Sequence, residues 1–349
     1  MFMKQILPIV MNDQFQRLAV IEDYTSFIWT TRYYAVGDFE LCVDVNAQNM
    51  ALFKQDYFIL REDDENIGII EDIVIQRNED GNEILIVSGR FLGGILARRI
   101  IAAQTTVSGK ISACVNKLIT DNIIDPEIAA RQIDNFVLGD YEIATTMKAQ
   151  YTGKNLLDTI SGICETYGLG FKVTLNDDNQ FVFQMYEGTD RTYDQNVNPW
   201  VIFSDAYDNL LSSEYEENYQ NIATAVLVAG EGEGSARKTA WVTDGATGLD
   251  RHEVYKDQRN IQSDDGEISD AEYTQLLQES GQESLTNYTT AFTGNVYFDN
   301  ITYKQDISVG DLCVIENTRW GIYINSRLVE VIESVSETGE YTIVPTFGK

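Results

Sequence analysis

Hydrophobic and polar residues alternate over much of the first hundred positions. Residues 39–45 run Phe-Glu-Leu-Cys-Val-Asp-Val, the period of two that marks a half-buried strand. Further strand candidates are residues 18–21, 27–33, 57–61, 67–77 and 83–90. The last two flank residues 78–82, whose Asp-Gly pair predicts a hairpin turn. Five or six short strands with no intervening helix predict a small barrel or sandwich over residues 1–100.

The period then changes to that of a helix. From Ser108 onward a first helical face is predicted by Ile111, Cys114, Val115, Leu118 and Asn122. A second helix is expected between Thr152 as the N-cap and Gly168 just past the end. Its apolar face comprises Leu156, Ile160, Ile163, Cys164 and Tyr167. A hairpin of residues 171–175 and 181–185 completes an α+β module, which we place at residues 101–198.

Strand patterns return in the last third of the chain, beginning at residues 222–228, before a glycine-rich loop at 230–235. Ser269 and Glu272 form a capping-box pattern that opens a helix, although Gly281 in its interior weakens it. That helix is expected to carry Tyr273, Leu276, Leu277, Leu285 and Tyr288. Further strands are predicted at 311–315, 322–324, 328–334 and 341–344, with a turn at 337–340. We therefore expect a second β module over residues 199–349, with a loop and helix insertion at about 230–292.

Composition supports this mainly β fold and adds a strong charge. The chain has 19 Tyr and 15 Phe but only 4 Pro, which favours pleated, half-buried surfaces. Its 55 acidic and 25 basic residues give a formal net charge of −30. Such a chain is a poor general binder of nucleic acid, and anionic membranes repel it. Two interpretations stay open: a surface that keeps the protein soluble, or a surface that DNA must pass without sticking.

The spacing of the cysteines argues against common metal and redox sites. Cys42, Cys114, Cys164 and Cys313 stand far apart and form no CxxC pair, so no zinc or redox motif is present. The apolar stretch at residues 6–11 is too short to span a membrane and lacks a cleavage site for a signal peptide. We expect synthesis in a reducing cytoplasm and no cofactor.

Three further patterns resemble functional sites without meeting their requirements. His252 is the single histidine and has no GxSxG nucleophile motif to accompany it, so a surface role is favoured. The glycines at 230, 232 and 234 lack the spacing of a phosphate-binding loop. The acidic turn at 264–267 lacks the twelve-residue spacing of an EF-hand, so a solvated turn is favoured over a calcium site. With 55 acids, close carboxylate pairs arise by chance and do not indicate a glycosidase.

Five segments, in order, resemble a tail-protein family of long-tailed phages and prophages of Gram-positive bacteria, the siphovirus ReqiPepy gp-thirty-seven-like family. They are FIWTTRYYAVGDFEL at 27–41, IGIIEDI at 67–73, VSGRFLGGILARRII at 87–101, SVGDLCV at 308–314 and SRLVE at 326–330. The family positions for which the resemblance implies a structural role are Trp29, Arg32, Tyr33, Gly37, Phe39, Arg90, Arg98, Arg99, Gly310, Asp311 and Arg327. Residues 190–290 carry no such motif. Arg98 and Arg99 are expected to orient the crossover into the second domain; the alternative is a surface ion pair.

The resemblance implies a non-enzymatic tail hub with a fold like that of baseplate hubs. In such hubs each chain supplies two tube-type β-barrels, and a homotrimer presents six barrels to a hexameric tail tube. The implied partners are a distal tail or tail tube protein, a tape-measure protein and tail fibre or receptor-binding tip proteins, with DNA passing through an axial channel. The implied location is the virion tail tip, after assembly in the host cytoplasm. Two alternatives stay open: a tail-associated cell-wall hydrolase or carbohydrate-binding tip protein, and a free acidic binding protein, which predicts a stable monomer.

Overall fold

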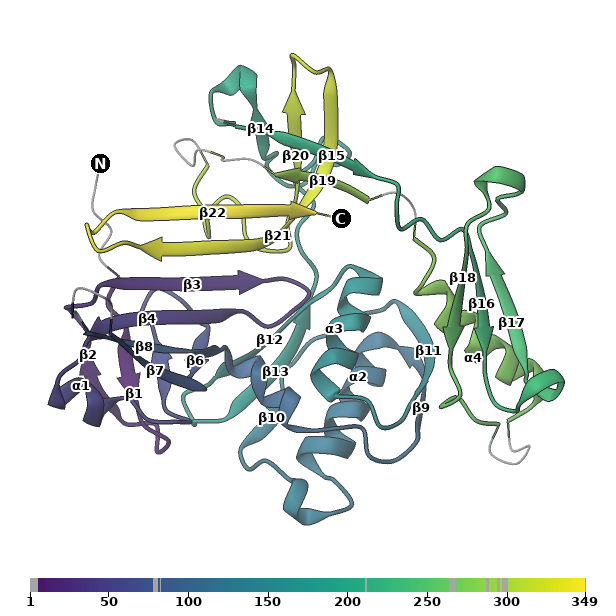
Figure 1. The fold of residues 1–349 in the computed structure, drawn as a ribbon, viewed down its shortest axis with the longest axis horizontal. Coiled ribbons are helices and arrows are strands. Elements are labelled where there is room, and N and C mark those ends of the chain that lie inside the picture. The colour runs from purple at the N-terminus through teal and green to yellow at the C-terminus, as the bar shows by residue number, and fades with distance from the viewer. Residues whose placement is uncertain are drawn as a thin grey trace.

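The computed structural model describes residues 6–77, 81, 83–210, 212–263, 268–286, 289–293, 296 and 301–348. Strands predominate, and a group of helices lies beside them in the middle of the chain (Figure 1). Among these residues, no helix has both the length and the apolar character needed to cross a membrane. The acidic turn at 264–267 lies outside the described residues, as do most of the predicted turn at 78–82 and Tyr288.

The first module is built from two sheets that face each other. One has the order β2-β1-β5-β6 and the other contributes β3, β4, β8 and β7. Their core comprises Val10, Phe27, Trp29, Phe39, Leu41, Ile59 and Val87. The bounds are β1 Ile9–Met11, β2 Arg17–Val20, β3 Ser26–Arg32, β4 Asp38–Asp44, β5 Phe58–Leu60, β6 Ile67–Ile69, β7 Asp72–Arg77 and β8 Glu83–Arg90.

Two predictions for this module are wrong in detail. The expected strand at 67–77 is two strands, β6 and β7, which belong to different sheets. A short helix, α1 (Ala47–Leu52), also interrupts the strands, because the Asn46 side chain accepts a hydrogen bond from the Asn49 N–H and caps it.

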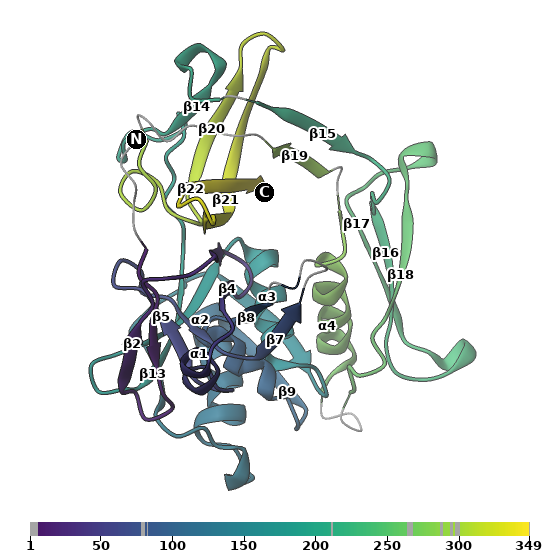
Figure 2. The ribbon, with the colours of Figure 1, turned by 60° about the vertical axis from the view of Figure 1, so that its left-hand side comes forward.

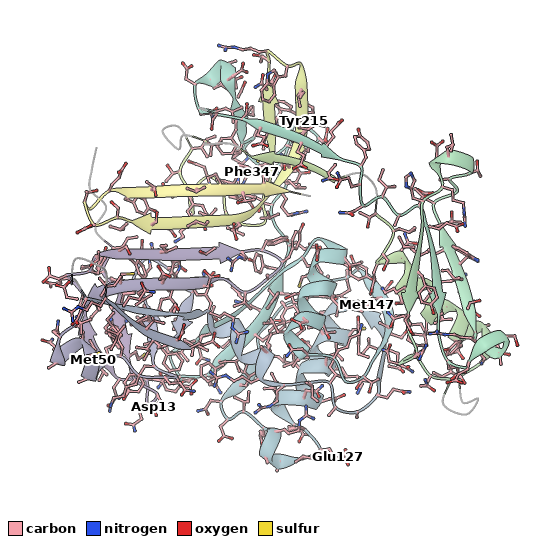
Figure 3. The ribbon with its side chains drawn as sticks, viewed as in Figure 1. Asp13, Met50, Glu127, Met147, Tyr215 and Phe347 are labelled. Carbon is pink, nitrogen blue, oxygen red and sulfur yellow. The ribbon has the colours of Figure 1, made fainter. Side chains whose placement is uncertain are left out.

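The α+β module packs two helices against short strands. Its elements are η1 Leu92–Arg98, β9 Thr105–Lys110, α2 Ile111–Ile119, the π-helical turn η2 Thr120–Ile124, η3 Ala129–Arg131, β10 Phe136–Leu138, β11 Thr146–Tyr151, α3 Leu156–Tyr167, β12 Gly170–Leu175 and β13 Phe181–Tyr186. Met147 of β11 belongs to its core (Figure 3). The first helix starts at Ile111, because residues 105–110 pair with β11 as a strand.

The second helix begins later than predicted. Asn155, not Thr152, is the N-cap of α3, and its side chain accepts hydrogen bonds from the Leu157 and Asp158 N–H groups. Gly153 has a φ of +66°, which excludes it from the helix. Gly168 ends the helix in the left-handed conformation, as predicted.

The third module contains the longest strand of the described chain. Residues 322–335 form one strand, β21, where two strands at 322–324 and 328–334 were predicted. Its other elements are β14 Ile202–Ser204, η4 Asp205–Tyr207, β15 Glu214–Asn218, β19 Thr289–Thr293, β20 Leu312–Asn317 and β22 Tyr341–Gly348. Phe347 of β22 is buried in this module's core, and Tyr215 of β15 packs against the same core (Figure 3).

The insertion forms a small unit of its own at the side of the molecule (Figures 1 and 2). Its sheet has the order β17-β16-β18, and one face is covered by helix α4. The bounds are β16 Ala225–Ala229, η5 Gly234–Ala236, β17 Thr239–Thr243, η6 Gly248–Asp250, β18 Glu253–Asp257 and α4 Asp270–Gln282. Residues 225–228, expected in the second β module, thus lie in the central strand of this sheet, and the glycine-rich loop joins β16 to β17.

The capping box of α4 is confirmed, with Ser269 and Glu272 bonded reciprocally. Gly281 lies inside the helix because a Cβ there would stand 2.6 and 2.7 Å from Val242 and Val228 of the sheet. The glycine that weakened the prediction is therefore what lets the helix approach the strands. Leu285 follows the helix end.

The first and third modules share one sheet. Strand β21 pairs antiparallel with β3, from Glu330 opposite Arg32 to Val335 opposite Phe27. The main path of the resulting ten-stranded sheet is β15-β19-β22-β21-β3-β4-β8-β7, and β14 and β20 branch from it. The expected mainly β fold with an α+β part is confirmed. The expectation of two separate closed barrels is not, since the strands within the described residues form an open sheet that runs through both modules.

Candidate functional site: the junction between the modules

Tyr33 connects all three modules. It follows β3 directly and is fully buried. Its hydroxyl donates to the Gly168 carbonyl at 3.0 Å and accepts from the Gly188 N–H at 2.8 Å. A Cβ on Gly170 or Gly310 would lie within 3.0 Å of the Tyr33 ring, so only glycine fits at both positions. The tyrosine thus occupies a site that backbone from the second and third modules encloses.

Arg327 of β21 covers the same ring. Its guanidinium carbon lies 5.2 Å from the ring centroid of Tyr33, and its Nη1 donates to the Gly310 carbonyl. Gly310 has a φ of +103°, a conformation that a side chain strains. Three of the family-motif positions, Tyr33, Gly310 and Arg327, therefore meet in one contact although they lie far apart in the sequence.

Asp311 makes the adjacent link from the third module to the end of the second. The carboxylate is buried and accepts hydrogen bonds from the N–H groups of Thr189 at 2.7 Å and Ser308 at 3.0 Å. Arg191 Nε also donates to it at 2.8 Å. A carboxylate with this many donors stabilises a fixed chain path, because each partner would otherwise lose a hydrogen bond on burial.

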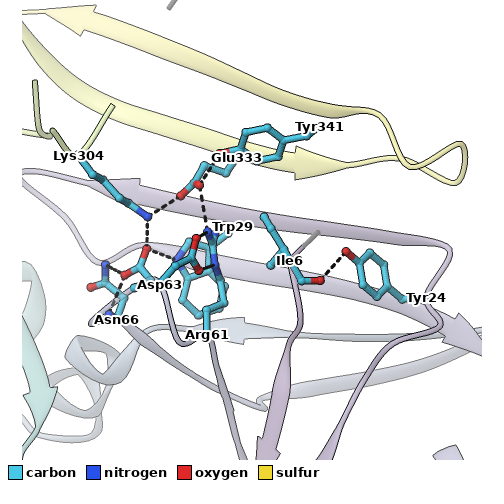
Figure 4. Close-up of polar contacts among 10 residues, drawn as sticks. Ile6, Tyr24, Trp29, Arg61, Asp63, Asn66, Lys304, Glu333 and Tyr341 are labelled. Atoms are coloured by element: carbon cyan, nitrogen blue, oxygen red, sulfur yellow. Dashed lines mark hydrogen bonds and ion pairs between the residues drawn. The ribbon is translucent and has the colours of Figure 1, made fainter. Parts of the chain in front are cut away.

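A buried charge network holds β21 of the third module against the first module (Figure 4). The Arg61 side chain has no exposed surface, yet it donates twice to Asp63, at 2.9 and 2.8 Å, and once to Glu333 at 3.1 Å. Lys304 Nζ donates to Glu333 at 2.9 Å and to Asp64 at 2.7 Å. Two cations thus face three carboxylates across the boundary between the modules.

Trp29 and Tyr341 complete this network. The Trp29 indole donates to Asp64 at 3.1 Å, and the Tyr341 hydroxyl donates to Glu333 at 2.7 Å. Burial by itself would raise the pKa of Glu333, but the charges of Arg61 and Lys304 outweigh burial and hold that pKa below its usual value. Glu333 is therefore a carboxylate that the fold keeps ionised although it is almost fully buried.

The other family-motif positions support the shared sheet locally. Arg32 pairs with Asp38 and, at 2.7 Å, with Glu330 of the neighbouring strand β21. Phe39 and Phe91 pack on Trp29, with ring centroids 6.2 and 4.5 Å away. Gly37 permits this packing, since a Cβ there would meet Thr30 and Phe91.

The arginines of the third motif lie away from the Tyr33 contact. Arg90 forms a two-pronged pair with Glu71 at 2.8 and 2.7 Å, which lowers the pKa of Glu71 chiefly through these hydrogen bonds. Arg98 pairs with Asp56 at 2.5 Å, and Arg99 donates to the Arg131 carbonyl at 2.7 Å. These contacts stand where the chain crosses into the α+β module.

Arg61, Lys304 and Glu333 were not among the positions singled out from the sequence. Glu333 has the one detectable signal, because it lies two residues from Val331 and from Val335 and so shares their buried face of the strand. An acidic residue at an inward position needs a basic partner. A register shift between Leu328 and Glu330 inverts the alternation along β21, so the inward face is clear only once that shift is known.

The histidine and the cysteines considered above do not form a catalytic or metal site in the described part of the chain. The His252 side chain is exposed, and all four cysteines are free thiols and buried. In the part of the chain that the structure describes, no three His, Cys, Asp or Glu side chains cluster as metal ligands would. A cavity of about 440 Å³ opens at the junction, where Lys172 pairs with Glu65 and Lys304 with Asp64. These charged side chains of the cavity are therefore paired with one another.

Comparisons with known proteins agree with this architecture. The family model described as siphovirus ReqiPepy6 Gp37-like protein matches residues 7–349. Among solved structures, the tail protein from Neisseria meningitidis MC58 is similar with a TM-score of 0.58, at 15% identity, over 99% of this chain and 97% of that one. The 43 kDa tail protein of prophage MuSo2 from Shewanella oneidensis gives 0.56 at 12% identity, over 97% and 98%.

Prophage tail protein gp18 from Listeria monocytogenes gives a TM-score of 0.53 at 12% identity, over 98% of this chain and 94% of that one. At these identities the structural likeness establishes the fold. None of the curated proteins matches the sequence.

Proposed function

The chain belongs to the siphovirus ReqiPepy6 Gp37-like family of tail proteins, and on this basis we propose that it is the tail hub. In this role a homotrimer joins the hexameric tail tube to the proteins of the tip and leaves an axial channel for DNA. Its partners are a distal tail or tail tube protein, the tape-measure protein and tail fibre or receptor-binding proteins. It works at the virion tail tip as a structural protein without catalysis.

The observation that carries this proposal is the shared sheet and the two open edges of its main path. Its main path has eight strands, four from each β module, and it ends at β7 on one side and β15 on the other. Unpaired N–H and C=O groups along an edge strand are a template for pairing with another chain. If β15 of one copy pairs with β7 of the next, three copies supply six modules, which matches the sixfold tube.

Such a ring requires a head-to-tail interface, in which two different surfaces of each copy meet. The two edge strands differ in sequence, as a head-to-tail interface requires. Strand β15 has the sequence Glu-Tyr-Glu-Glu-Asn, whereas β7 is Asp-Ile-Val-Ile-Gln-Arg with Ile73 and Ile75 exposed. In a ring closed in this way, the tube-type modules would be segments of one continuous sheet, instead of two separate barrels in each chain.

The junction described above supports a fixed angle between the two modules. A ring closes only when every copy has the same curvature, so the modules of one chain must not swing relative to each other. The β3–β21 pairing, the enclosed Tyr33 and the buried Arg61 network all restrain that motion.

The sheet face opposite the core suits the wall of a channel for DNA. One row across six strands consists of Thr342, Ser334, Ile28, Glu40, Ser88 and Asp72. Arg32, on the same face, is paired with two carboxylates. Hydroxyls, an aliphatic side chain and carboxylates offer phosphates no cation to hold, so the duplex would slide. The competing account is that the acidic residues serve solubility from the outer surface.

The mass of the particle in solution tests the proposal. Light scattering at micromolar concentration should give three times the chain mass of 39.4 kDa for the protein alone, or three copies of the chain per particle when the tube-side partner is bound. A dimer or a monomer under both conditions would contradict the hub. Wall-degrading activity that disappears in His252→Ala would favour a tail-associated hydrolase instead.

A further inference from the structure

A recess of about 250 Å³ opens between the first module and the α+β module. Its lining is mostly apolar and includes Phe58, Ile69, Ile95, Ile133 and Phe181. Arg98, Arg99 and Asp56 complete the lining. Small-molecule sites usually span about 300–1,000 Å³, so this recess suits one protein side chain better than a free ligand. We call it the arginine-lined recess.

Within the described residues, one of the two arginines that line the recess, Arg99, has no carboxylate partner. Arg98 pairs with Asp56, but Arg99 donates only to the carbonyls of Arg131 and Arg98 in the described part of the chain. Arg131, beside Arg99, donates to the Ile100 carbonyl and the Asn122 amide oxygen. Burial, followed by the charges of Arg131 and Arg98, lowers the pKa of Arg99. The chain has 55 acidic residues, yet as far as the structure describes it, the guanidinium groups of Arg99 and Arg131 donate only to neutral oxygens. A carboxylate from another chain would therefore form stronger, charge-assisted hydrogen bonds with them.

The insertion presents a side chain of complementary character. Leu249, in the loop between β17 and β18, is 97% exposed, the highest value among the large apolar side chains described. Asp250 follows it and Asp244 lies at the start of the same loop. Within the described residues, neither aspartate forms an ion pair. A single exposed leucine is ordinary, but an exposed leucine next to carboxylates that form no ion pair within the described residues matches an apolar recess lined with arginine.

We propose that Leu249 of one copy inserts into the arginine-lined recess of the next copy, with Asp250 facing Arg99 and Arg131. This inference rests on the proposed ring. The insertion follows β15 in the chain, whereas the recess includes Ile69, the last residue of β6, which lies just before the start of β7. Pairing of β15 with β7 of the next copy therefore brings these two surfaces to the same interface. Within one chain they lie apart, since the insertion stands at the far side of the α+β module (Figures 1 and 2).

The apolar half of the contact is tested with Leu249→Ser. Because Leu249 is exposed, the fold of the single chain should be unchanged, and thermal melting checks this. Buried apolar anchors dominate interfaces, so we expect trimer association to weaken by about tenfold or more in a dilution series followed by light scattering. The matched control is Val197→Ser, which removes an apolar side chain that is 89% exposed elsewhere. Equal weakening by the control would overturn the proposal.

The charged half is tested by exchange. Arg99→Glu and Asp250→Arg should each weaken the trimer, and the double variant should recover most of the loss, because the pair is restored with opposite polarity. Full-strength trimers in both single variants would overturn the proposal.

A third measurement does not depend on the fold tolerating Arg99→Glu. With Leu249→Cys and Ile133→Cys in one chain, mild oxidation should link copies into covalent trimers, while each single variant should not. Intact trimers that fail to cross-link would refute the Leu249 contact but leave the hub proposal standing. A wild-type protein that never forms trimers would refute the hub itself.

Discussion

At the scale of the residue, Arg61 depends most on its partners, because its charged side chain is completely buried. A buried guanidinium loses its hydration, and the fold compensates with Asp63 and Glu333, while the ring of Trp29 lies 5.6 Å away. Removing one partner of a buried pair costs about 3–5 kcal/mol, because the remaining charge stays buried without compensation. A single substitution in the network should therefore weaken the contact between the first and third modules.

Glu333→Gln should lower stability at neutral pH by about 3 kcal/mol and flatten its dependence on pH. The pKa of Glu333 is depressed in the folded protein, so its contribution is fully present above about pH 4.3, the ordinary glutamate value, and is lost as pH falls through the folded pKa. Thermal unfolding between pH 3 and 7 measures this. The wild type should lose more stability than the variant below pH 4.3, and Glu337→Gln, on the exposed β21–β22 turn, serves as control. Parallel curves for wild type and Glu333→Gln would show that the charge adds nothing.

At the scale of the element, strands with strong alternation were predicted nearly to the residue, as at 83–90 and 181–185. The failures have physical causes. The strand expected at 67–77 breaks at Ile70 and Glu71, where Gly89 of β8 approaches the Ile69 carbonyl so closely that a Cβ would clash. The β3–β21 pairing joins residues about 300 positions apart, and no local pattern encodes it. Tyr33, Gly310 and Arg327 were identified by family motif, but their mutual contact needed the fold.

The exposed isoleucines of β7 allow a test of the ring at this scale. Lysine on an edge strand opposes pairing with another chain. Ile73→Lys with Ile75→Lys should leave the melting temperature nearly unchanged, since these side chains are 38% and 51% exposed, and should abolish the trimer. The control is Leu18→Lys with Val20→Lys on β2, the edge of the other sheet, where the side chains are 46% and 50% exposed. Sedimentation or light scattering distinguishes the outcomes, and trimers in the β7 variant would argue that the ring closes elsewhere.

At the scale of the whole molecule, each chain has a formal charge of −30, so the proposed ring of three chains would have −90. Screening at physiological salt extends over about 8 Å, so carboxylates that line a channel only slightly wider than the duplex repel it. The surface potential of the assembled ring would separate this arrangement from acidic residues confined to the outside.

Glu40→Lys places one cation per copy on the proposed channel face and should create DNA binding that weakens between 50 and 200 mM salt. Glu22→Lys changes the net charge equally at an exposed position of the first module and should not. Fluorescence anisotropy with a short duplex measures both. Tight, salt-sensitive binding by the wild-type trimer would contradict a non-adhesive channel.

Because β21 lies in the middle of the sheet, the sheet can form only after β21 has been synthesised. A ribosome completes β3 well before β21, because Arg32 and its partner Glu330 are 298 residues apart. Until then one edge of β3 is unpaired, and a chain that ends before β21 lacks the strands β21 and β22 that connect β15 to the rest of the sheet. In the proposed ring, a chain without β21 would therefore be unable to pair with its neighbours on both sides. If the chain assembles as proposed, truncated products of translation that lack β21 would be excluded from the particle without a separate protein to detect them.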